Sequence, residues 1–129
     1  MTCNCNCNCN CNNLNPYFHK STSLQLVEGG EEAASYVSIS VTNSTNIDSL
    51  DYFELVLTIN PNTVVTGAPV AFKINVNGTD VALLNRYSLP INTNRLNVRK
   101  RYYGAYVVPT SGDPYVILWN TPTNPAYAN

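Results

Sequence analysis

The chain has 129 residues, a formal net charge of -1 at pH 7 and only 12% charged residues. This length supports one domain whose core is large enough to fold without disulfides or metals. The near-neutral charge argues against a partner recognised by overall charge, such as nucleic acid or an anionic membrane. Neither a basic and apolar secretory leader nor an apolar stretch of about 20 residues is present, so we expect synthesis in a cytosol, where thiols stay reduced.

The first element in the chain is an arm over residues 1–16 in which cysteine and asparagine alternate. All five cysteines occupy alternate positions, namely Cys3, Cys5, Cys7, Cys9 and Cys11. In an extended backbone this spacing places the thiols on one edge and the asparagines on the other. Asparagine is a poor helix former, so the pattern predicts an extended Cys/Asn arm.

Residues 17–120 are typical of a β domain, and residues 121–129 of a loose tail. Alternating apolar and polar residues predict eight short strands, at 21–28, 36–42, 52–59, 69–77, 81–84, 96–101, 102–108 and 114–119. Asn77-Gly78 predicts a tight hairpin, because both central positions of that turn need positive φ. Trp119 is expected in the core. Eight strands without a helix indicate a sandwich or barrel-like fold, and of these we predict a single antiparallel β-sandwich or jelly-roll-like domain.

The thiols of the arm have three interpretations. Neighbouring cysteines are about 6.6 Å apart by strand rise, at the limit of an unstrained disulfide, so cross-links between arms of different subunits are favoured over bonds within one arm. The second interpretation is an amphipathic strand that docks in a groove, with cysteines acting as small apolar residues. The third is a zinc or copper(I) site, although structural zinc sites usually have two-residue gaps and these gaps hold one.

A basic run follows in the second half of the body. It comprises Arg86, Arg95, Arg99, Lys100 and Arg101. Nearby tyrosines would suit base stacking, but three consecutive basic residues in a strand point to both faces, so nucleic acid is disfavoured. We expect an inter-subunit or other anionic contact, in which this run meets an acidic turn of a neighbour.

Catalysis is not expected. The chain has one histidine, His19, and none of the motifs that carry a nucleophile, a phosphate or a paired-histidine metal. The acidic residues cluster in two places that we expect to be solvated loops, Glu28, Glu31 and Glu32, and Asp48, Asp51 and Glu54. No cofactor, small-molecule substrate or membrane partner is expected, and a metal, if any, would be held by the arm cysteines.

The C-terminal half contains four segments, VNGTD (76–80), LNRY (84–87), RLNVRKRYYG (95–104) and PYVILWN (114–120). Together they resemble small virion proteins of AT-rich tailed phages, in particular the crAss-like group of gut bacteriophages. The resemblance implies a non-enzymatic capsid decoration or head-fibre subunit on the virion surface, made in the host cytoplasm. It would bind copies of itself and other capsid or fibre proteins, with the arm as its attachment. No functional residue carries over.

The arm itself is similar in plan to the subunits of bacterial endospore appendages, which join a Cys-bearing connector to a jelly-roll body and link subunits by disulfides. Those subunits also use cysteines of the body, and residues 12–129 of this chain contain none. This resemblance implies a disulfide-linked fibre subunit at a spore or cell surface. We therefore expect first a structural protein that self-assembles or decorates a particle, as a phage capsid-surface or head-fibre protein. A spore-type fibre subunit is the second expectation, and a small thiol-based metal-binding protein is the third.

Overall fold

A computed structural model describes residues 18–31 and 33–122. The Cys/Asn arm, including all five cysteines, and residues 123–129 lie outside the described residues. The elements are β1 (Phe18–Val27), β2 (Tyr36–Val41), β3 (Tyr52–Val56), a 3-10 turn η2 (Pro61–Thr63), β4 (Ala71–Val76), β5 (Thr79–Leu84), β6 (Arg101–Val107) and β7 (Tyr115–Leu118). The described part of the chain contains no α-helix, so the all-β prediction is confirmed.

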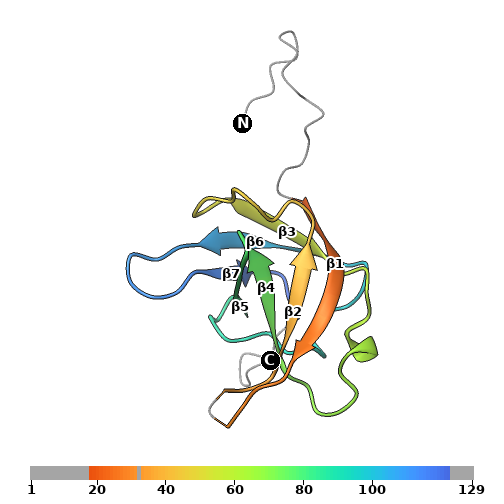
Figure 1. Ribbon diagram of the computed structural model, residues 1–129. Coiled ribbons are helices and arrows are strands. Elements are labelled where there is room, and N and C mark those ends of the chain that lie inside the picture. The colour runs from red at the N-terminus through yellow and green to blue at the C-terminus, as the bar shows by residue number, and fades with distance from the viewer. Residues whose placement is uncertain (1–17, 32, 123–129) are drawn as a thin grey trace.

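The strands close into one barrel in the order β1-β2-β4-β5-β7-β6-β3, with β3 pairing back to β1 (Figure 1). Three of the seven pairings are parallel, β1 with β3, β2 with β4 and β5 with β7. An antiparallel sandwich or jelly roll is therefore not confirmed. Hydrophobic periodicity shows which face of a strand is buried, but it carries no information about which strand lies beside it.

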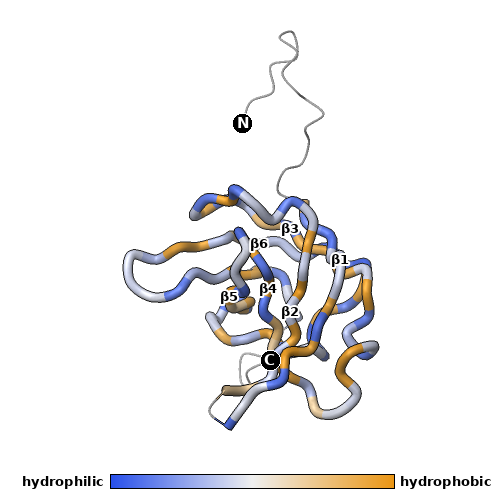
Figure 2. The backbone as a smooth tube through the Cα atoms, viewed as in Figure 1, coloured by the Kyte–Doolittle hydropathy of each residue, from blue (hydrophilic) through white to orange (hydrophobic). Residues whose placement is uncertain are grey.

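The barrel interior is filled by the apolar faces that the alternation predicts. Phe72, Ile74 and Val76 of β4 point inward and are at most 1% exposed. Phe53 and Leu55 of β3 are fully buried, and Tyr102 of β6 is the largest fully buried side chain. Apolar and polar residues alternate along the tube in Figure 2 in the same way. The core is thus built by side chains that point inward from all seven strands.

The hairpin predicted at Asn77-Gly78 is confirmed. Asn77 has φ 53° and Gly78 has φ 85°, the left-handed conformation at both central positions. This geometry matches the natural twist of an antiparallel pair, so β4 and β5 continue directly on either side of the turn. The side chain of Asn77 also donates to the carbonyl of Ile47 at 2.9 Å, which ties the hairpin to the loop before β3.

Two predictions about the second half are wrong. Residues 96–100 do not form a strand: they turn, with Arg99 at φ 70°, and only Val98 makes an isolated bridge, to Leu57. Trp119 is not in the core, because 48% of its surface is exposed. It follows β7 directly, and the alternation that buries Leu118 places Trp119 on the outside.

Candidate assembly surface

The arm joins the barrel at Phe18, the first residue of β1. Phe18 pairs with Glu54 of β3, and the guanidinium of Arg101 lies 4.7 Å from the centroid of its ring. Arg101 Nη1 also lies 2.6 Å from Glu54 Oε2, and the ammonium of Lys20 is 5.5 Å from the Phe18 ring. Two cations thus lie over the Phe18 ring on the outer side of the barrel wall, and the ion pair between Arg101 of β6 and Glu54 of β3 holds one of them in place.

His19, the next residue, points the other way and is fully buried. Its ring stacks on Phe53 at a centroid distance of 4.0 Å, and Nδ1 lies 2.8 Å from the carbonyl oxygen of Thr42. Because a carbonyl only accepts, Nδ1 carries the proton, and Nε2 is a buried atom with no hydrogen-bond partner. Burial lowers the pKa of His19, opposed by the Thr42 hydrogen bond and the charge of Glu54. His19 is therefore a neutral packing residue.

The prediction for Glu54, the acidic residue opposite Phe18, is wrong. Glu54 was expected in a solvated loop with Asp48 and Asp51, but it lies in the middle of β3 and is only 8% exposed. Its partner Arg101, which we expect at an inter-subunit or other anionic contact, pairs with Glu54 within the chain. Because 53% of the Arg101 side chain is exposed, its role between subunits stays a prediction. The remaining acidic turn residues that the structure describes, Glu28, Glu31, Asp48 and Asp51, lie outside the strands, and Glu32 is not described.

The outside of the barrel divides into a polar part and an apolar part. The outward positions of β1, β2 and β4 are mostly polar, among them Lys20, Gln25, Ser38, Ser40, Lys73 and Asn75. The outward positions of β3, β6, β7 and the end of β5 are mostly apolar or aromatic. We call the following residues the apolar face: Tyr52, Ala82, Leu84, Tyr103, Ala105, Val107, Tyr115, Ile117 and Trp119. Tyr52 and Trp119 are exposed, Ala105 is buried at 8% exposure, and the other six are half-buried.

Strand register shows that the apolar face is continuous. Across one level, Tyr52 of β3 is opposite Ala105, Ala105 is opposite Ile117 of β7, and Ile117 is opposite Leu84 of β5. Residues directly opposite each other in a ladder share a face. These four residues therefore lie next to one another on the same side of the barrel wall.

A second row runs from the root of the arm across the same wall. Phe18 is opposite Glu54, and Glu54 is opposite Tyr103 of β6. The backbone N–H of Trp119 donates to the carbonyl of Tyr103 at 2.7 Å, which brings Trp119 beside it. The rings of Tyr103 and Tyr52 stack at 6.2 Å and join this row to the row described above. The arm thus leaves the barrel at the edge of the apolar face.

The apolar face carries little charge. β3, β6 and β7 contain one acidic and one basic residue, Glu54 and Arg101, and these two pair with each other. Two further exposed apolar residues lie close to it in the chain, Leu50 at 75% exposure shortly before β3 and Val108 at 45% exposure directly after β6. Partial burial raises the pKa of the Tyr52 hydroxyl, and the charges of Glu54 and Tyr103 raise it further. The part of the face on β3, β6 and β7 thus has no net charge, and Asp80 of β5 lies at its polar border.

The basic residues do not gather on one strand face. Arg95, Arg99 and Lys100 lie in the loop before β6, whereas Arg86 lies in the loop after β5. The guanidinium of Arg86 stacks over the ring of Tyr87 at 5.1 Å, and the ammonium of Lys100 lies 5.7 Å from the ring of Tyr102. Their role as an inter-subunit contact stays a prediction.

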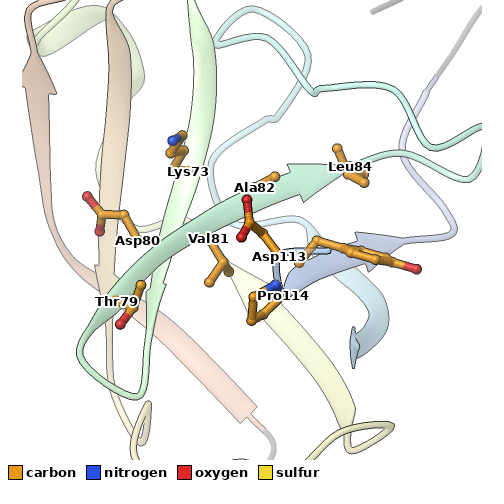
Figure 3. Close-up of a pocket in the computed structure, with 9 residues that line it drawn as sticks. Lys73, Thr79, Asp80, Val81, Ala82, Leu84, Asp113 and Pro114 are labelled. Atoms are coloured by element: carbon orange, nitrogen blue, oxygen red, sulfur yellow. The ribbon is translucent and has the colours of Figure 1, made fainter. Parts of the chain in front are cut away.

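A hollow of about 520 Å³ lies where the polar and apolar parts of the wall meet (Figure 3). Lys73 of β4 and Asp80 of β5 border it on the polar side, and Leu84 and Tyr115 on the apolar side. Burial acts to raise the pKa of Asp80, but hydrogen bonds from Asn75, Ser38 and Tyr36, together with the charge of Lys73, lower it overall. Through these hydrogen bonds, the Asp80 carboxylate of β5 links β2 and β4.

No protein-family model, curated protein or solved structure matches the chain. Within residues 18–31 and 33–122, no three His, Cys, Asp or Glu side chains are grouped in a way that would hold a metal ion. The described residues also include no helix with the length and apolar character needed to cross a bilayer. The arm cysteines lie outside these residues.

Proposed function

We propose that the protein is a non-enzymatic structural subunit that assembles with copies of itself, with disulfides between Cys/Asn arms as its covalent links. The observation that carries the proposal is the closure of the barrel. In the closed barrel every strand has a neighbour on both sides, although residues 21–27 of β1 pair only with β2, so little strand edge is left for subunits to join by adding strands to one another. We therefore expect association to use mainly the outer wall and the arm.

The position of the cysteines supports arm-to-arm bonds. All five lie within the first 11 residues, so the barrel offers no thiol as a partner. An odd number leaves at least one thiol of each monomer unpaired, which favours bonds between chains. Each bond joins two thiols as they lose two protons and two electrons to an oxidant such as molecular oxygen, once the protein has left a reducing cytosol.

The resemblance of the C-terminal half to small virion proteins supports a place on a phage capsid surface or head fibre, where neighbours would be copies of the chain and other capsid or fibre proteins. A disulfide-linked subunit of a spore appendage or similar fibre is the second candidate, supported by the plan of a Cys-bearing arm followed by a β domain. Both candidates use the arm in the same way.

Gel electrophoresis of the oxidised protein, with and without reductant, tests the proposal. We expect a ladder of multimers that collapses to the monomer on reduction and is missing when all five cysteines are replaced by serine. Monomers of equal mobility in both lanes, with stoichiometric zinc or copper by elemental analysis, would contradict cross-linking and establish a metal-binding arm instead.

A further inference from the structure

We infer that the apolar face is a non-covalent binding surface for a second copy of this chain. The inference rests on the proposed function and deepens it, since it names the surface through which subunits meet before their arms are linked. Tyr52 is 41% exposed and Trp119 48%, although both have large apolar rings. Tyrosine and tryptophan are enriched among the interface residues that contribute most of the binding free energy.

The charge distribution identifies the partner as another copy. Two identical faces meet without repulsion only if neither has a net charge. On β3, β6 and β7 the single acidic residue, Glu54, is paired with the single basic residue, Arg101, at 2.6 Å. A strongly charged partner would find no complementary charge here, whereas a second apolar face finds a matching surface.

The size of the face sets the strength of the contact. The face spans four neighbouring strands about 4.8 Å apart and, along each strand, three outward positions about 6.8 Å apart. Its flat area is therefore roughly 400 Å². A stable complex buries about 800 Å² on each partner, and weaker ones bury less than about 600 Å². Because a barrel wall is also convex, we expect a reversible dimer with a dissociation constant in the micromolar range or above.

The position of the arm agrees with this partner. Phe18 lies at the end of the row that runs through Tyr103 to Trp119, so two copies that meet at this face bring the roots of their arms to the borders of the same interface. The 17 residues that precede Phe18 span at most about 60 Å when fully extended, more than the width of the face. Cysteines of two arms can therefore reach each other in such a dimer, and a disulfide would convert a weak contact into a permanent one.

Sedimentation equilibrium of the five-serine protein tests the inference without disulfides. Between about 10 and 500 µM we expect the mass to rise from one chain towards two. Trp119→Lys should raise the dissociation constant at least tenfold, and Val107→Lys, at the other end of the face, should act in the same direction. Gln25→Lys makes the same charge change on the exposed outer side of β1 and serves as the control. Circular dichroism would verify that each variant is folded.

A five-serine protein that stays monomeric up to about 500 µM would overturn the inference, as would equal dissociation constants for Trp119→Lys and Gln25→Lys. These outcomes are separate from those of the proposed function. A dimer of the five-serine protein, without any disulfide ladder in the native protein, would support dimerisation through the apolar face and contradict cross-linking through the arm. A ladder in the native protein, together with a monomeric five-serine protein, would support cross-linking through the arm and contradict dimerisation through the face.

Discussion

Gly104 of β6 lies very close to the backbone of β7, and Gly104→Ala should destabilise the fold strongly. A Cβ at this position would lie 1.6 Å from the carbonyl oxygen of Ile117, where real Cβ atoms stay beyond 3.0 Å. The obstacle is backbone of β7, which is paired to β6 on one side and β5 on the other, so it cannot move away alone. Overpacking of this kind costs about 3 kcal/mol, which lowers the melting temperature of a domain of this size by about 15 °C.

Thermal unfolding followed by circular dichroism under reducing conditions would measure the shift. Gly67→Ala is the matched control, because a Cβ there meets nothing within 4 Å and the backbone is not left-handed. That variant should melt within a few degrees of the parent, or slightly above it, since alanine restricts the unfolded chain. If Gly104→Ala melted within about 4 °C of the parent, the close approach of β6 and β7 would be refuted.

Three further changes test the polar contacts of the barrel. His19 has a lowered folded pKa, so the folded state binds fewer protons than the unfolded state, and stability should fall as pH drops below about 6.5; chemical denaturation at several pH values should show a smaller fall for His19→Phe. Arg101→Ala should cost about 1–3 kcal/mol because it leaves the buried Glu54 carboxylate unpaired, and adding Glu54→Gln in a double-mutant cycle should recover part of that loss. Asp80→Asn should cost about 1–2 kcal/mol in urea unfolding, since an amide has one acceptor oxygen in place of two and Asp80 accepts from three side chains; an unchanged midpoint would contradict the role assigned to Asp80.

The strands themselves could be predicted, because burial of one face leaves a direct record in the sequence. The observed β2 and β4 lie within the predicted ranges 36–42 and 69–77 and bury the residues that the alternation indicated. The hairpin at Asn77-Gly78 could also be predicted, since few residue pairs tolerate positive φ twice. Such signals are local, and each is complete within a few residues.

The pairing of strands could not be predicted, because it depends on contacts between residues far apart in the chain. Nothing in the periodicity of β1 indicates that Phe18 lies opposite Glu54, or that this pairing is parallel. The prediction of a strand at 96–101 failed for a related reason. Leu96 and Val98 do alternate with polar residues, but Leu96 is buried and Val98 packs partly buried against the core from a turn and not from a strand.

The candidate surface was missed for a third reason. Trp119 was assigned to the core because it is large and apolar, although its position one residue after the inward Leu118 predicts the opposite face. Tyr52 and Tyr103 likewise stand at positions that alternate with Phe53 and Tyr102, which are fully buried. The two-residue alternation of a strand, applied without regard to side-chain type, places all three aromatic residues on the outside. Only the register could show that they lie together.

Closure of the barrel explains why both the face and the arm would be needed for assembly. A wall with every strand paired is protected from uncontrolled edge-to-edge association, but it also gives up the strongest means that β proteins have for joining one another. In the proposed assembly the apolar face would give selectivity at low strength, because its contact is too small to persist alone. The arm would supply strength without selectivity, because five similar thiols can pair in many ways. If a face contact forms first in the reduced protein, it decides which arms meet, and oxidation then fixes that choice.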